Sequence, residues 1–112
     1  MRPEYRIGRQ NPLWPKLNPD DPEYLLWMNW QLMVTKCHDP KNKLYRHYSK
    51  RLITVCPAWR LFAGFRQWAR ISGYRNGLVL GRICNDASYC PENCEWLTAS
   101  ERAVRNGRLA SR

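Results

Sequence analysis

The chain has 112 residues and a net charge of +10, from 19 Lys and Arg against 9 Asp and Glu. This length allows one domain of ordinary size and leaves little room for a second. No run of about 18 apolar residues is present, so we predict neither a membrane span nor a membrane partner. The first residues lack the apolar centre of a secretory signal peptide, so we predict a cytoplasmic protein with reduced cysteines.

The positive charge is concentrated in the second part of the chain. Residues 1–40 hold five basic and five acidic residues, whereas residues 41–112 hold fourteen basic and four acidic ones. Eleven of those fourteen are Arg, whose planar guanidinium suits phosphates and base edges. Because a phosphate neutralised by Lys or Arg releases condensed counterions, we predict a polyanion partner, with DNA in first place. An acidic protein surface would fit the same charge.

Residues 1–21 form the first predicted segment, an extended arm. They contain four prolines and show no apolar periodicity. The rest of the chain, residues 22–112, is predicted as a single domain. Trp14 and Leu17 are the side chains of the arm that we expect to pack onto it.

Helix signals begin directly after the arm. Asp21 is the predicted N-cap, Pro22 lies in the first turn, and Glu23 stands at the positive end of the helix dipole. Aromatic and apolar residues then occupy much of the helix circumference. We therefore predict a largely buried helix that ends near Lys36, followed by a polar loop over residues 39–48.

A strand and a second helix are expected next. Residues 52–56 are apolar and partly β-branched, which predicts a short buried strand. Pro57 opens the second predicted helix and Gly73 ends it. The predicted buried stripe of this helix consists of Trp59, Phe62, Phe65 and Ala69.

The last part of the chain predicts two strands and a helix. Residues 78–83 and residues 95–97 have the composition of strands, and the polar residues 85–88 between them predict a turn. Thr98 and Glu101 match a capping box, in which each side chain satisfies a backbone N–H of the helix start. The order is that of a ββα unit, so the predicted fold class is α+β.

Three stretches carry motifs of one known family, in the same order. Residues 27–37 are similar to the pattern W-x-x-M-x-x-R-C, and residues 45–65 to Y-x-x-Y-G-G-R-G-I-x-V-C-x-x-W-x-x-F-x-x-F. Residues 77–96, GLVLGRICNDASYCPENCEW, resemble G-L-x-L-D-R-I-D-N-D-G-x-Y-S-P-E-N-C-R-W. The chain thus resembles the small HNH endonucleases of phages and mobile elements.

The resemblance implies a fold and a chemistry. The fold is a small ββα-metal (HNH-like) core with two preceding helices and an irregular N-terminal arm. The chemistry of the family uses a divalent cation such as Mg²⁺, which polarises the scissile phosphate, and a base that activates water. A late Asn of the family's last helix is matched here by Asn106.

This chain departs from the family pattern where the metal would bind. Gly81 and Cys84 stand where the pattern has Asp, and no Arg can act as a conventional base. The remaining candidates for an active site are Asp86, Asn93 and Asn106. One carboxylate and two amides form a weak set for a hard cation, so we predict that cutting has been lost. An active, divalent-metal-dependent nicking or homing-type DNA endonuclease is the alternative.

Basic residues in three places are the predicted nucleic-acid contacts. Lys50 and Arg51 stand in a turn whose family counterpart is rich in glycine, and the last helix carries arginines at intervals of three. A solvated charged face is the simpler interpretation of that helix stripe. The predicted set is Lys50, Arg51, Arg82, Arg102, Arg105 and Arg108.

The cysteines allow a second kind of site. Cys84, Cys90 and Cys94 could supply three zinc ligands. The fourth ligand would be Cys37, Cys56 or His38. Their spacing lacks a C-x-x-C pair, so buried thiols that fill gaps in the core are the favoured interpretation, and no cofactor is predicted with preference.

The predicted function is that of a phage-type nucleic-acid-binding protein, active in host takeover, on a degenerate HNH scaffold. It would act in the host cytoplasm. A third hypothesis is a phage inhibitor of a host nucleic-acid-processing or defence protein, with the Trp-rich N-terminal half as its interface.

Overall fold

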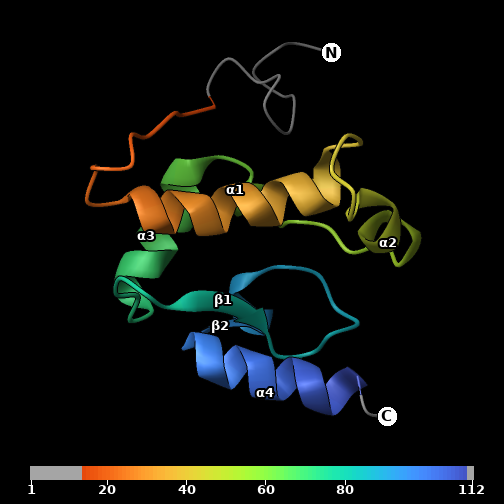
Figure 1. The fold of residues 1–112 in the computed structure, drawn as a ribbon. Helices are drawn as coiled ribbons and strands as arrows, with labels where there is room; N and C mark the ends of the chain where they lie inside the picture. The colour runs from red at the N-terminus through yellow and green to blue at the C-terminus, as the bar shows by residue number, and fades with distance from the viewer. Residues whose placement is uncertain (1–13, 111–112) are drawn as a thin grey trace.

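The sequence order strand, strand, helix at the end of the chain is present in the fold (Figure 1). The computed structural model describes the backbone of residues 14–110, and side chains as far as Arg105. Within that range it is an α+β domain with four α-helices and a two-stranded antiparallel sheet. The elements are α1 (Tyr24–His38), α2 (Tyr45–Lys50), the 3₁₀ turn η2 (Pro57–Trp59), α3 (Phe62–Ile71), β1 (Val79–Arg82), the 3₁₀ turn η3 (Pro91–Asn93), β2 (Cys94–Leu97) and α4 (Ala99–Ala110).

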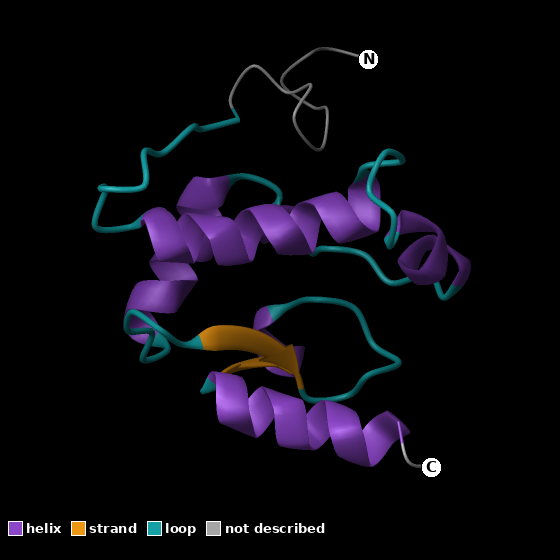
Figure 2. Ribbon diagram, viewed as in Figure 1, coloured by secondary structure: helices purple, strands orange, loops and turns teal. Residues whose placement is uncertain are grey.

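The hairpin of β1 and β2 lies between two helical layers (Figure 2). The register runs from Val79 opposite Leu97 to Arg82 opposite Cys94. Helix α4 packs on both strands, and α1 crosses the molecule beyond the other side of the hairpin. Gly81 faces α4, since a Cβ built on it would contact Leu97 and Arg105.

Aromatic side chains form most of the core. Trp30 and Trp59 are fully buried, and the Trp30 indole N–H donates to the Trp59 carbonyl at 2.8 Å. The Trp59 ring meets Phe65 edge to face at a centroid distance of 5.2 Å. Trp14 of the arm stacks on Trp30 at 4.3 Å, which ties the described end of the arm to the core.

Helix α1 differs from its prediction at both ends. Its N-cap is Glu23 rather than Asp21, and the Asp21 carboxylate instead accepts the Glu23 N–H at 2.8 Å. The helix also continues past Lys36 to His38, where Asp39 turns to extended backbone before Pro40. Extended backbone is what a following proline favours, so the Pro sets the end of the helix.

The prediction of a loop up to residue 48, followed by a strand over residues 52–56, was wrong in part. Residues 45–50 form the short helix α2, which packs against α1. Leu52 then adopts a positive φ of 57° and is 81% exposed. Only Val55 is paired as in a sheet, through an isolated bridge to Tyr89. The segment remains short because its partner is a loop and not a strand.

The helix predicted from Pro57 is divided in two. Residues 57–59 form η2, and α3 starts only at Phe62 because Leu61 is extended. Gly64 allows η2 to lie against α3, since a Cβ there would stand 1.8 Å from the Ala58 carbonyl oxygen. Gly73 follows the end of α3 with a φ of 89°, the left-handed conformation expected after a helix.

Among the described residues no helix is long and apolar enough to cross a bilayer.

Candidate nucleic-acid interface

The loop between β1 and η3 is held from inside by Arg82. Its guanidinium donates to the carbonyls of Asn85 and Ala87 at 2.6 and 3.0 Å, and to the Asn85 side-chain oxygen at 3.1 Å. The sequence places Arg82 at the end of a strand, from which its side chain reaches over the turn. Three of its donors are therefore used within the protein, and they connect β1 to the loop.

Arg51 holds the same loop from the side of α2. It donates to the Asn85 carbonyl at 2.9 Å and to the Asp86 carboxylate at 2.7 Å. The Asp86 side chain is 89% exposed and the Arg51 side chain 29%. The one carboxylate expected to bind a cation is thus paired with a guanidinium at the surface.

The Asn93 side chain is hydrogen-bonded to the backbone of the same loop. Its side-chain oxygen accepts the Cys84 N–H at 2.8 Å, and its nitrogen donates to the carbonyls of Cys84 and Ser88 at 3.1 and 3.0 Å. The residue is buried, so these bonds satisfy groups that water does not reach. We conclude that Asn93 is engaged with the backbone rather than available to a metal.

Gly81, which stands where the HNH-like pattern has its first Asp, is closely packed. A Cβ added at Gly81 would stand 2.6 Å from Leu97 Cδ1 and 3.4 Å from the Arg105 guanidinium. Arg105 forms an ion pair with Glu95 and donates to the Arg82 carbonyl at 3.2 Å. The described residues therefore do not fit a divalent cation here, because a guanidinium lies beside the place where a ligand would be needed.

The rings of Tyr48 and Tyr89 lie close to two cations, Arg82 and Lys36. The Arg82 guanidinium is 5.0 Å from the centroid of the Tyr89 ring and 5.5 Å from that of Tyr48. Lys36 Nζ lies 5.4 and 5.8 Å from the centroids of Tyr48 and Tyr89. Burial lowers the pKa of Lys36, and burial raises the pKa of the Tyr89 hydroxyl. Of these groups, only Arg82 is among the nucleic-acid contacts predicted from the sequence.

A polar cleft of about 120 Å³ opens among these groups and α4. Three guanidinium groups line it, and no carboxylate does among the described residues. The Arg102 guanidinium forms no hydrogen bond or ion pair with any described residue, which makes it the most available cation of the cleft. The lining is Tyr48, Leu80, Gly81, Arg82, Asn85, Tyr89, Leu97, Arg102 and Arg105.

The structure brings together three of the six predicted nucleic-acid contacts, those on β1 and α4 that line the cleft. Arg51 does not line the cleft but donates to the carbonyl of Asn85, which does. Lys50 is exposed on α2. Arg108 and Asn106 belong to α4, but their side chains lie outside the described residues. The periodicity rules could not find Lys36, because a single Lys on a buried helix carries no pattern.

The cysteines are distributed over different environments. Cys84 is exposed, Cys90 is half-buried and Cys94 is buried, with burial raising the pKa of the Cys94 thiol to about 12. Of the fourth-ligand candidates, Cys37 is buried, and the His38 Nε2 accepts the Val55 N–H at 3.2 Å. In the described part of the chain no three His, Cys, Asp or Glu side chains are placed to hold a metal. Zinc binding stays a prediction without geometric support.

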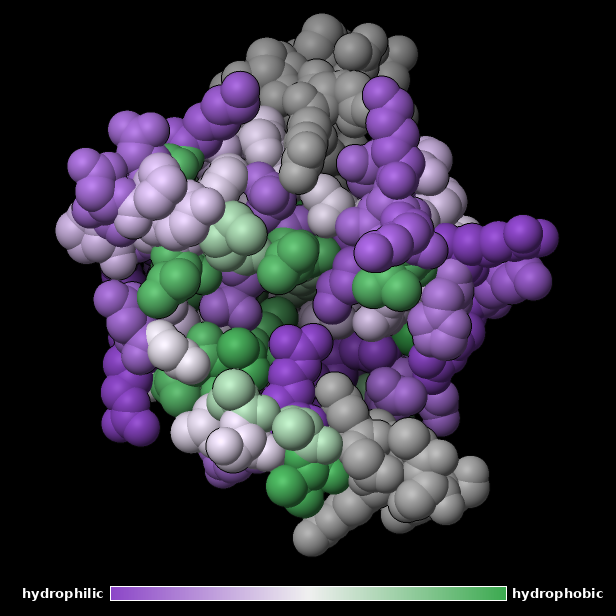
Figure 3. Space-filling view, viewed as in Figure 1, coloured by the Kyte–Doolittle hydropathy of each residue, from purple (hydrophilic) through white to green (hydrophobic). Residues whose placement is uncertain are grey.

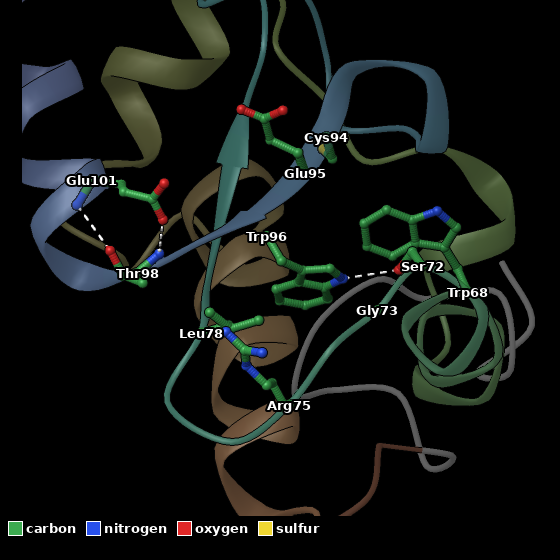
Figure 4. Close-up of a pocket in the computed structure, with 10 residues that line it drawn as sticks. All are labelled: Trp68, Ser72, Gly73, Arg75, Leu78, Cys94, Glu95, Trp96, Thr98 and Glu101. Carbon is green, nitrogen blue, oxygen red and sulfur yellow. Dashed lines mark hydrogen bonds between the residues drawn. The ribbon is translucent and has the colours of Figure 1, made fainter.

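A larger cavity of about 390 Å³ lies beside β2 and the start of α4 (Figure 4). Trp96 forms its wall and donates to the Ser72 hydroxyl at 2.9 Å. The predicted capping box is confirmed there: the Glu101 carboxylate accepts the Thr98 N–H at 2.8 Å, and the Thr98 hydroxyl accepts the Glu101 N–H at 3.1 Å. Glu95 and Glu101 both line this cavity, so its charge does not favour a polyanion.

Comparison with protein-family models, with curated proteins and with solved structures gave no match to this chain.

Proposed function

We propose that this protein binds DNA without cutting it, on a degenerate HNH-like scaffold of phage type. The observation that carries the proposal is the cleft lined by Arg82, Arg102 and Arg105, with no carboxylate in its described lining. Such a cleft concentrates positive potential and attracts phosphates. The order β1, β2, α4 supports the scaffold, and the charge of residues 41–112 supports the choice of partner.

The proposal that cutting is lost rests on the occupied ligands. Asp86 is paired with Arg51, and Asn93 is bonded to the backbone. Gly81 offers no ligand, and a side chain there would require Leu97 to move. Metal-dependent cleavage needs an accessible cation site beside the phosphate, and the cleft presents guanidinium groups in its place.

Binding is tested by fluorescence anisotropy with labelled DNA over a series of salt concentrations. For a protein that neutralises several phosphates, log K falls linearly with log salt, with a slope of about −0.9 per phosphate on duplex DNA. We expect Arg102→Gln to weaken binding to all sequences alike and to reduce this slope by about one. Arg75→Gln is the matched control, because Arg75 is exposed and lines the other cavity.

Cleavage is tested on supercoiled plasmid with Mg²⁺ or Mn²⁺. We expect no nicking by the wild-type protein. Nicking that Asp86→Ala abolishes would overturn the proposal in favour of an active endonuclease. Salt-independent binding, or no binding at low salt, would instead favour an inhibitor of a host protein, whose interface would include the exposed side chains of Leu25 and Leu32.

A further inference from the structure

The cationic cleft continues into a second cavity with a different character. This cavity has a volume of about 240 Å³ and lies between α1, α2 and the sheet. The two cavities share the lining residues Leu80, Tyr89 and Arg102, so they lie next to each other, and we refer to the pair as the groove. One end of the groove is cationic and the other end is apolar.

Apolar side chains from two helices form the apolar end. Leu32 on α1 and Leu44 before α2 line it and are 51% and 44% exposed, while Met33 and Leu80 form its buried wall. In Figure 3 apolar side chains gather over α1 and β1 on this face, beside a hollow between α1 and α4. Exposed leucines around a hollow mark a surface on which a ligand can bury apolar area.

Cations and a tyrosine ring connect the two ends. Arg102 lines both cavities, and Lys36 lines the apolar one while its ammonium lies over the rings of Tyr48 and Tyr89. A ligand that fills the groove therefore carries an anionic group next to a flat, largely apolar body. A nucleotide has this arrangement, with a phosphate one sugar away from a base.

We propose that the groove binds single-stranded nucleic acid, with one unstacked base in the apolar cavity and the adjoining phosphate on Arg102. This inference rests on the proposed function and specifies its substrate. In a duplex the bases are stacked and paired, so a base enters a pocket only if it is first unstacked and unpaired, which costs free energy. Drug-sized ligands occupy pockets of about 300–1,000 Å³, so a cavity of about 240 Å³ suits one base and no more.

The experiment compares three probes of equal length by anisotropy. They are a single strand, the duplex of the same sequence, and a strand of abasic sugars that keeps the phosphates. Contact between a base and an aromatic ring such as that of Tyr89 strengthens the binding of a single strand, and neither of the other probes offers an unstacked base. We therefore expect the single strand to bind about tenfold more tightly than either of the other probes.

The variant pair tests the cavity itself. Leu32→Gln with Leu44→Gln removes the apolar rim without adding charge, and both residues are exposed enough for the fold to be retained. We expect this variant to bind the single strand no more tightly than the strand of abasic sugars, with the salt slope of the wild type. Leu25→Gln is the control, since Leu25 is 48% exposed on the same helix but does not line the cavity.

The outcomes separate this inference from the proposed function. Equal, salt-dependent affinity of the wild type for the single strand and the strand of abasic sugars overturns the base pocket and leaves DNA binding intact. Salt-independent or absent binding of every probe overturns both. A tenfold preference that survives the double substitution also overturns the pocket, because the preference must then arise elsewhere.

Discussion

Gly81 shows how the lack of one side chain allows a cation to lie beside a strand. Its backbone lies in β1 against Leu97 and Arg105, and a side chain there would require Leu97 to move. The guanidinium of Arg105 then lies beside the strand and is balanced by Glu95. The loss of a side chain at position 81 and the placement of a cation there are thus two aspects of the same packing.

A carboxylate introduced at position 81, where the HNH-like pattern has Asp, should therefore destabilise the protein. We expect Gly81→Asp to lower the free energy of unfolding by about 1–3 kcal/mol, because overpacking forces Leu97 to move. We also expect that Mg²⁺ does not raise the melting temperature of this variant. Urea denaturation and thermal melts with and without Mg²⁺ measure both effects. A smaller cost of Gly81→Ala in a Leu97→Ala background than in the wild type would confirm the steric cause, because Leu97 is itself buried and its truncation has a cost of its own. Full wild-type stability of Gly81→Asp would contradict it.

At the scale of elements, helix ends are decided by short-range bonds and strands by their partners. The capping box of α4 involves residues three apart, so the sequence contains all of its geometry. The segment around Val55 has strand composition, but its only sheet-like partner is Tyr89 in a loop. Helix α2 packs against α1, a contact that local propensity does not encode.

The turn after α2 provides a test at this scale. Leu52 closes the turn with a positive φ, its N–H donating to the Ser49 carbonyl at 3.0 Å, and its side chain is 81% exposed. A left-handed conformation costs an L-residue about 1–2 kcal/mol, and glycine removes this cost. The greater entropy of the unfolded chain with glycine offsets part of that gain. We expect Leu52→Gly to raise the free energy of unfolding by up to about 1 kcal/mol in urea titrations.

Ile71→Gly is the matched control for this change. Ile71 is also 81% exposed but lies in α3, where glycine costs about 0.5–1 kcal/mol. The two substitutions should shift the urea midpoint in opposite directions. A loss of stability in both would show that Leu52 contributes more through its side chain than its backbone costs.

At the scale of the whole molecule, the half-buried cation Lys36 lies between α1 and the sheet in a protein of net charge +10. Desolvation lowers the pKa of Lys36, and the charge of Arg102 adds to this effect. The unfolded chain therefore holds the Lys36 proton more tightly than the folded one. Below the folded pKa, Lys36 is charged in both states, and its desolvation lowers the free energy of unfolding by the full amount. This destabilisation decreases as the pH rises from the folded pKa to the ordinary pKa of Lys.

We expect Lys36→Met to raise the melting temperature at pH 7 and to reduce the increase in stability at alkaline pH. The same variant should weaken nucleic-acid binding, because a cation of the groove is lost. Melting temperatures over a pH series and anisotropy titrations measure the two effects. A variant that is less stable at pH 7 would show that the contacts of Lys36 with the rings of Tyr48 and Tyr89 outweigh its burial.

The sequence by itself determined the α+β class, the β1–β2–α4 order and the start of α4. These features depend on composition, on periodicity and on residues a few positions apart, all of which are local in the sequence. Only the tertiary structure decided that Asn93 is bonded to the loop and that Asp86 is paired with Arg51, and it alone placed Lys36 beside Tyr48 and Tyr89. The physical reason is that a side chain's availability depends on neighbours that are distant in the chain, whereas its chemical type does not.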